Sequence, residues 1–515
     1  MSATAGRLAT RVAAGILLTR LLGFARERVF AHYFGSTPAA DAFRAALKIP
    51  NVIRNLLGEG TLSASFIPVY AGLLARGDGE GARKLAGVIA SLLTVLTATA
   101  ALAGIGLAPI ITDIAAPGFS GATRDLTVTL VAIMFPMSGI TILSAWCLGV
   151  LNTHRRFFLS YAAPALWNVA QIATLVAAGA YLAGASLAVA LAWGALGGSV
   201  LQLLAQLPAA LRLAGRLRWS LDRDTPGVRQ VIRTWLPVVF GAGVAQVSSI
   251  IDTQLGSLLG TGAVATLGYA QLLAVLPVSL FGVSVAAATL PELARDAVAA
   301  DRAALNSRIA EGGRRVMFFI LPSAAALAVL GTPLVGALFE TGQFSADDTA
   351  VVAAVLAAYA VGLPGQASVK LLASGFYGLG DTRSPVRAAT VSMIVSAALA
   401  ALLMRWLGAA GIALGASAGA YVNLVMNARG LSRRLGPLVT GGAVRWFVVS
   451  AAGSGAAAAA GAGMTRLMAT WHHVAVATAA CLAFAGVYGA GTLLLRHPDA
   501  LRLARRWRRS GGDTA

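Results

Sequence analysis

The sequence predicts an all-α, polytopic membrane protein with about fourteen transmembrane helices. Hydrophobic residues make up 57% of the 515 residues and only 12% are charged, whereas a soluble globular chain carries about 25% charged residues. Long apolar runs recur, and they do not alternate between apolar and polar residues as the strands of a membrane β-barrel do. At about 20 residues per crossing, the chain has room for this number of helices joined by short loops.

The predicted helices are apolar segments bounded by charges and by glycine and proline clusters. In the first part of the chain they lie at 8–34, 38–75, 86–112, 126–152, 158–182 and 186–211. In the rest they lie at 230–259, 263–294, 313–339, 348–377, 386–407, 410–432, 442–464 and 472–495. A cleaved signal peptide is not expected, because Arg20, Arg26 and Arg28 interrupt the first apolar run.

The loops between these helices alternate in charge. Every second loop is rich in arginine, and the loops between them hold few cations, chiefly Arg124, Arg405 and Arg466. This positive-inside pattern predicts a multi-pass protein of the bacterial cytoplasmic membrane with both termini in the cytoplasm. Most of the net charge of +20 is therefore topological, and cations without interleaved aromatic residues do not indicate a nucleic-acid partner. The basic tail from Arg502 to Arg509 is expected to attract anionic membrane lipids.

Two pairs of similar segments predict an internal repeat. The segment from Ala46 to Pro68 resembles Leu273 to Pro291, and Gly149 to Pro164 resembles Gly375 to Pro385. The expected architecture is two six-helix lobes in a parallel pseudo-twofold repeat, a layout typical of alternating-access transporters. The predicted boundaries are 1–220 for the N-terminal lobe, 221–438 for the C-terminal lobe, and 439–515 for helices 13 and 14 with the basic tail.

Charged residues cluster in the first two predicted helices, and helices 3 to 6 contain almost none. The candidate substrate-binding residues are Arg20, Arg26, Asp41, Arg44, Lys48, Arg54 and Glu59. A cation at the bilayer centre costs roughly 2.5 to 3.5 kcal/mol, so such a cluster indicates a wet cavity that binds an anion. Guanidinium groups pair with phosphate oxygens, which favours a lipid-linked phosphate or pyrophosphate. The alternative is that Arg20 and Arg28 reach the interface while Glu27, Asp41 and Glu59 form structural ion pairs.

The sequence also bears on energy coupling. Asp252 lies in the apolar helix 230–259 near Ser248, Ser249 and Thr253, and is a candidate sodium or proton site. The alternative is a carboxyl group that is hydrogen-bonded to neighbouring helices. No phosphate-binding loop is present, so the membrane potential, Na⁺ or H⁺ is the expected energy source and no cofactor is expected. Cys147 and Cys481 lie in apolar runs and indicate neither a disulfide nor a metal site.

A series of short motifs follows in order along the chain. They are Thr19–Glu27, Asp41–Phe43, Lys48–Asn51, Arg54, Glu59–Gly60, Ser63, Phe66–Pro68, Ala116–Phe119, Leu151–Thr153 with Arg156–Phe157, Gly342–Phe344 and Gly375–Tyr377 with Asp381 and Pro385. This series resembles the MurJ (MviN-type) lipid II flippases of the multidrug/oligosaccharidyl-lipid/polysaccharide exporter superfamily. Arg20, Arg26 and Arg54 match arginines of the family, and Asp41, Lys48 and Glu59 fall on its polar positions.

The resemblance implies a lipid transporter. It implies fourteen helices, a cationic central cavity, and a groove for the polyprenyl tail formed by helices 13 and 14. The implied activity is transfer of lipid II, the lipid-linked peptidoglycan precursor, from the inner to the outer leaflet. We expect the protein to act as a monomer.

One segment departs from the family pattern. Where the family commonly has Tyr-Ala-Asp-Arg-Leu, this chain reads Tyr-Ala-Gln-Leu-Leu from Tyr269 to Leu273, so one cation of the anion site is missing. Arg44 is a candidate substitute. The departure leaves open another polyprenyl-pyrophosphate-linked saccharide as the substrate. A multidrug exporter is the other alternative, although the net-positive helices disfavour cationic drugs. An enzyme is not expected, because the non-cytoplasmic loops are too short to carry the paired acid–base groups of a catalytic site, and the acid pair Asp347–Asp348 lies at a helix start.

Overall fold

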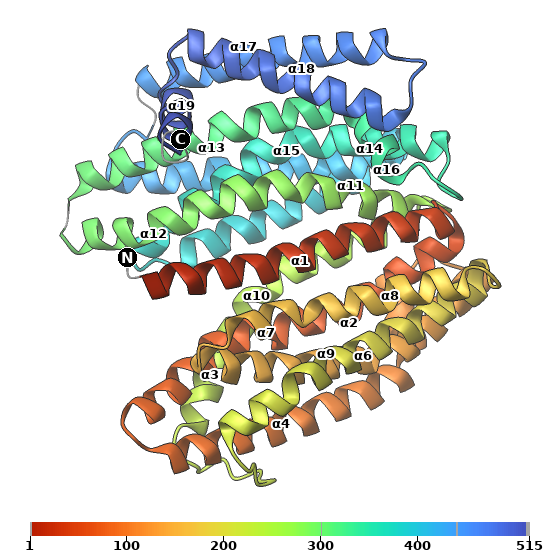
Figure 1. Cartoon of the computed structure of the whole chain (residues 1–515), viewed down its shortest axis with the longest axis vertical. Helices are drawn as coiled ribbons and strands as arrows, with labels where there is room; N and C mark the ends of the chain where they lie inside the picture. The colour runs from red at the N-terminus through yellow and green to blue at the C-terminus, as the bar shows by residue number, and fades with distance from the viewer. Residues whose placement is uncertain (1–2, 300, 439–440, 511–515) are drawn as a thin grey trace. The chain divides into compact units, whose positions relative to one another are not determined.

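The computed structural model describes residues 3–299, 301–438 and 441–510, and these are almost entirely helical (Figure 1). Within these ranges the only β-structure is an isolated bridge between Thr341 and Phe344. Ten helical segments of the described residues are long and apolar enough to cross a membrane. The predicted all-α membrane fold is thereby confirmed, and the number of fourteen crossings stays a prediction.

The chain forms two compact units. The first comprises Met1–Ala265 together with Thr341–Phe344, and the second comprises Thr266–Glu340 and Ser345–Ala515. The division into lobes at 1–220 and 221–438, with 439–515 as a separate segment, stays a prediction.

In the first unit, helices surround an apolar core formed by α3, α4, α6 and α9. Its helices are α1 (Ala3–Phe34), α2 (Pro38–Leu57), α3 (Glu59–Ala75), α4 (Gly79–Gly106), α5 (Ala108–Ala115), α6 (Gly121–Thr153), α7 (Phe157–Ala162), α8 (Pro164–Ala178), α9 (Gly184–Ala214) and α10 (Val228–Ser257). The predicted helix 38–75 is divided at Gly58, where a Cβ atom would lie 2.4 Å from the Arg54 carbonyl oxygen. Glycine therefore allows the break between α2 and α3.

The second unit holds most of α11 and the remaining helices. They are α11 (Ala263–Pro277), η1 (Val278–Val283), α12 (Ser284–Val298), α13 (Arg302–Val329), α14 (Gly331–Phe339), α15 (Ala346–Gly378), α16 (Arg383–Leu435), α17 (Gly441–Leu467), α18 (His473–Leu494) and α19 (Pro498–Ser510). The π-helix η1 follows Pro277, which lacks a backbone N–H group. Gly408, with φ of 56°, bends α16 between the helices predicted at 386–407 and 410–432. Helices α17 and α18 pack side by side (Figure 1).

Helices α6 and α15 end in the same hydrogen-bonded turn. The Arg156 N–H donates to the Leu151 carbonyl at 2.8 Å, and the Asp381 N–H donates to the Phe376 carbonyl at 2.9 Å. The residue before each donor has a left-handed backbone, with φ of 60° at Arg155 and 74° at Gly380. Such turns satisfy the last carbonyl groups of a helix. The turns lie at equivalent positions of the predicted repeat, and their likeness supports it.

Two of the family motifs make close backbone contacts within the first unit. The Gly118 N–H donates to Ser257 Oγ at 3.0 Å, and a Cβ atom on Gly118 would lie 2.2 Å from the Ser257 carbonyl oxygen. The Gln343 N–H donates to the His32 carbonyl at 2.8 Å, and neighbouring Gly342 has φ of 58°. These glycines let two backbones approach each other, so both motifs have a structural explanation.

Candidate anion-binding site on α1 and α2

Arg26 and Arg44 converge on a single carboxylate, that of Glu27. Arg26 Nη2 lies 2.5 Å from Glu27 Oε1, and Arg44 Nη2 lies 2.8 Å from Glu27 Oε2. Glu27 is 8% exposed, and the arginine side chains are 17% and 16% exposed. Buried charges are normally paired, and here one carboxylate serves two guanidinium groups. Asp41 is a second carboxylate whose charge interacts with Arg44.

Aromatic rings flank both guanidinium groups. Arg26 Cζ lies 4.8 Å from the centre of the Trp167 ring, and Arg44 Cζ lies 4.9 Å from the centre of the Phe30 ring. Such contacts attract the cation and restrict its position. Sequence patterns do not identify Trp167 as part of the cluster, because it arrives from α8 through the packing of that helix on α1.

Asp41 makes a different contact. It is 1% exposed, and its carboxylate accepts hydrogen bonds from the backbone N–H groups of Gly262 and Ala265, the latter at 2.7 Å. These N–H groups lie at the start of α11, where a helix has no internal acceptors for them. Asp41 therefore caps α11, and its role in substrate binding stays a prediction.

Lys48 and Asp252 lie close enough for their charges to interact, and both are half-buried. Lys48 belongs to α2 and Asp252 to α10, two helices that pack together. The same two helices are joined by the Asn55 side chain, whose Nδ2 donates to Gln246 Oε1 at 3.2 Å. Opposite charges on α2 and α10 thus lie near each other in the first unit.

The hydroxyl groups near Asp252 are engaged elsewhere. Ser249 Oγ donates to a backbone carbonyl at 2.8 Å, and Thr253 Oγ1 donates to another at 3.4 Å. Within the described part of the chain, no group of three or more His, Cys, Asp or Glu side chains is placed to hold a metal ion. Asp252 therefore has a lysine as its charged neighbour, and these two hydroxyls donate to backbone carbonyls rather than to its carboxylate.

The other predicted site residues lie along the same helices. Arg20 is exposed on α1, and Arg54 is half-buried in the last turn of α2. The side chain of Glu59 lies outside the described part of the structure. On α11, Gln271 and Leu272 are half-buried where the family commonly has its Asp-Arg pair.

Charged helices such as α1 and α2, in a chain with ten described segments able to cross a membrane, are typical of a membrane transporter. The family model for lipid II flippase MurJ matches residues 30–485 of this chain. A lipid II flippase MurJ of Burkholderia cenocepacia is 35% identical over 439 residues, which cover 84% of each chain. A probable lipid II flippase MurJ of Rhizobium meliloti is 36% identical over 427 residues, 81% of this chain and 78% of the relative. The chain belongs to the lipid II flippase MurJ family.

Solved structures show the same fold. A lipid II flippase MurJ in an inward closed conformation matches with a TM-score of 0.80 and 21% identity, covering 94% of this chain and 98% of its own. An inward-facing multidrug resistance MATE family transporter of the MOP superfamily matches with a TM-score of 0.68 and 17% identity, covering 84% and 98%. Family membership confirms a transporter rather than an enzyme, located in the bacterial cytoplasmic membrane.

Proposed function

We propose that this protein moves lipid II from the inner to the outer leaflet of the cytoplasmic membrane. Family membership supports the transport class, and the charges of α1 and α2 support an anionic lipid. The observation that carries the proposal is the convergence of Arg26 and Arg44 on Glu27. Two guanidinium groups that meet at one carboxylate are also placed to bind the oxygens of a pyrophosphate, which takes the place of Glu27.

In the proposed cycle, the pyrophosphate competes with Glu27 for Arg26 and Arg44, and Arg20 and Arg54 complete its binding site. Access to the site alternates between the two sides of the membrane. When the lipid leaves, the arginines return to Glu27, which avoids the cost of unpaired charges in a medium of low dielectric constant. Helices α17 and α18 accommodate the polyprenyl tail, as the family resemblance implies.

Complementation of a strain depleted of its own lipid II flippase tests this function. The wild-type chain is expected to restore growth, and Arg26→Ala and Arg54→Ala are expected to fail at equal membrane expression. Arg433→Ala is the matched control, because Arg433 is an exposed cation in the last turn of α16. Full activity of Arg44→Ala would remove Arg44 from the proposed site.

Another polyprenyl-pyrophosphate-linked saccharide is the second candidate substrate. The half-buried Gln271 and Leu272 favour it, because they leave α11 without the family's Asp-Arg pair. Failure of the wild-type chain to complement, with its presence in the membrane verified, would support this substrate. Measuring externally accessible lipid II in the same cells separates the two candidate substrates, because its amount rises only if this chain moves lipid II.

For energy coupling, we propose that Asp252 takes up a proton during the cycle. The charge of Asp252 in α10 interacts with that of Lys48 in α2, so the gain or loss of a proton at Asp252 changes the charge pairing between the two helices. Transport by the wild-type chain is expected to depend on the proton gradient, and transport by Asp252→Asn is expected to lose that dependence. Transport that ignores the proton gradient in both proteins would exclude this role, and a dependence on sodium would replace the proton with that ion.

A further inference from the structure

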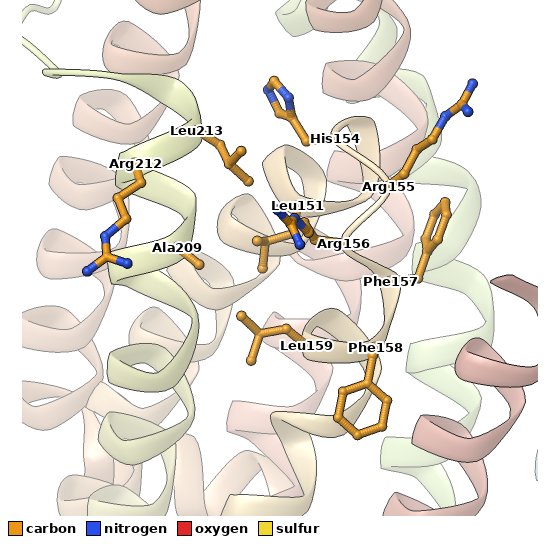
Figure 2. Close-up of a pocket in the computed structure, with 10 residues that line it drawn as sticks. All are labelled: Leu151, His154, Arg155, Arg156, Phe157, Phe158, Leu159, Ala209, Arg212 and Leu213. Carbon is orange, nitrogen blue, oxygen red and sulfur yellow. The ribbon is translucent and has the colours of Figure 1, made fainter. Parts of the chain in front are cut away.

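A second cationic site lies in the first unit, away from the Glu27 cluster. A pocket of about 670 Å³ opens where the end of α6, the short α7 and α9 meet (Figure 2). Six of its lining residues carry the inference: Arg155, Arg156, Arg212, Phe158, Leu159 and Leu213.

The three arginines of this pocket are exposed. Among the described residues, the pocket lining includes no carboxylate, and no acidic side chain pairs with any of the three. Three guanidinium groups at one pocket therefore attract an anion, and phosphate oxygens match their hydrogen-bonding geometry.

A second pocket of similar size provides a comparison. It measures about 690 Å³ and lies beside the first turns of α4. It also carries four cations, but Glu80, Asp222 and Asp224 line it as well, and Lys84 Nζ lies 2.9 Å from Glu80 Oε1. Acids therefore line this pocket beside its cations, although Asp224 pairs with Arg229 outside the lining, whereas no acid lines the arginine pocket.

The backbone at Arg155 adds an independent observation. Its φ of 60° is a conformation that favours glycine, and the equivalent turn at the end of α15 has Gly380 there. An arginine at this position strains the backbone, and it places a cation at the pocket. Figure 2 shows the Arg155 side chain extending away from the turn, at the opposite end of the view from Phe158.

The other end of the pocket is apolar. Phe158 is 50% exposed, and Leu159 lies beside it in the lining (Figure 2). A ligand that contacts the cationic and the apolar end carries a phosphate group next to hydrocarbon chains, as a phospholipid does. Basic pockets between membrane helices bind anionic lipid headgroups in this way.

We propose that this pocket binds an anionic phospholipid, with the phosphate at Arg155, Arg156 and Arg212 and the acyl chains along Phe158 and Leu159. In the proposed orientation this lipid belongs to the inner leaflet. It is a bound membrane lipid rather than the transported substrate, and it joins the α6–α7 turn to α9.

Native mass spectrometry of the full-length protein in detergent tests the proposal, with phosphatidylglycerol as the ligand. Replacing each arginine by glutamine is expected to weaken binding about fivefold, and the triple variant about 100-fold. The matched control is the triple variant Arg83→Gln/Arg216→Gln/Arg218→Gln in the second pocket, which acids also line. This variant is expected to bind the lipid as the wild type does. Size-exclusion profiles verify that the variants stay folded, and single variants remain informative if the triple variant does not.

Three results would overturn the proposal. They are unchanged binding by the triple and single arginine-pocket variants, an equal loss in the control variant, and phosphatidylcholine binding as tightly as phosphatidylglycerol. Inorganic phosphate at millimolar concentration is expected not to displace the lipid. Displacement by phosphate alone would be a fourth such result, because it would show that the pocket recognises an inorganic anion and that the acyl chains add nothing to binding. Complementation is a separate readout, so failure here is distinguishable from failure of the proposed flippase activity.

Discussion

At the residue scale, Glu27 supplies a negative charge to two arginines of the predicted substrate site. Its carboxylate contacts both Arg26 and Arg44, and all three side chains are largely buried. The sequence identifies the cations, because each stands out in an apolar helix. Their pairing is a property of how α1 packs on α2, which no local pattern encodes.

The replacement Glu27→Gln is expected to destabilise the protein. It removes the carboxylate that contacts both guanidinium groups, and breaking a buried pair costs about 3 kcal/mol. The thermal unfolding midpoint in detergent is expected to fall. The double variant Glu27→Gln/Arg44→Met is expected to recover part of the loss, because it removes one of the two cations that lost this partner. A double variant that loses more stability than its two single variants lose together would contradict this pairing.

At the element scale, Asp41 connects α2 to the start of α11. The replacement Asp41→Ala is expected to cost about 1 to 2 kcal/mol, because the N–H groups of Gly262 and Ala265 lose their acceptor. Asp41→Asn keeps one acceptor oxygen and is expected to lose less. Thermal unfolding measures both variants. Complementation by Asp41→Asn at low temperature is expected to be normal if capping is its main role, whereas stable but inactive Asp41→Asn would show a role in substrate binding.

Asp381 performs a similar function between α15 and α16. Its carboxylate accepts hydrogen bonds from the Ser384 hydroxyl at 2.6 Å, from the backbone N–H groups of Ser384 and Arg383, and from Arg434 at 2.5 Å. The Ser384 hydrogen bonds, followed by those from Arg434 and Arg383, hold the pKa of Asp381 well below its usual range. The ionised carboxylate therefore stabilises this turn.

The stabilisation by Asp381 is expected to depend on pH. A carboxyl group whose pKa is lowered on folding contributes fully above its unfolded pKa of about 3.9. The contribution is lost as the pH falls from that value toward the lower pKa of the folded state. Asp381→Asn is therefore expected to unfold at a lower temperature than the wild type at pH 6, with a smaller difference at pH 3. A difference that does not shrink at pH 3 would show that ionisation of Asp381 is not the cause.

Helix positions were predictable from the sequence, but several boundaries and partners were not. The apolar runs correspond to helices, and Gly408 falls between the two segments predicted at 386–407 and 410–432. The break at Gly58 and the π-helix after Pro277 lie inside apolar runs, where hydropathy does not change. The cap of α11 by Asp41 spans 224 residues to Ala265, and such a contact arises only from tertiary packing.

At the scale of the whole molecule, equivalent turns of the predicted repeat carry different chemistry. At the end of α15, Gly380 adopts the left-handed backbone without strain, and the Asp381 carboxylate accepts a hydrogen bond from the Ser384 hydroxyl. At the end of α6, Arg155 and Arg156 occupy these two places and have no acidic partner among the described residues. The same hydrogen-bonded turn thus carries a structural cap in the second unit and lines a cationic pocket in the first.

The topology of the chain can be tested with cysteine labelling. The charge pattern predicts that residue 223 faces the cytoplasm and residue 181 faces outward, because one crossing separates them. Arg223→Cys and Tyr181→Cys, made in a Cys147→Ala/Cys481→Ala background, place thiols at exposed positions. In intact spheroplasts a membrane-impermeant maleimide is expected to label Tyr181→Cys, and to label Arg223→Cys only after permeabilisation.

A second pair of cysteines tests the number of crossings. Two predicted helices, 230–259 and 263–294, separate residue 223 from residue 302, so both are expected inside, and one further crossing places residue 347 outside. Arg302→Cys and Asp347→Cys occupy exposed positions in the second unit. Labelling of Arg302→Cys in intact spheroplasts would show an odd number of crossings between the two sites. Because every later loop would then be inverted, that single result would contradict both the fourteen-helix count and the cytoplasmic C-terminus.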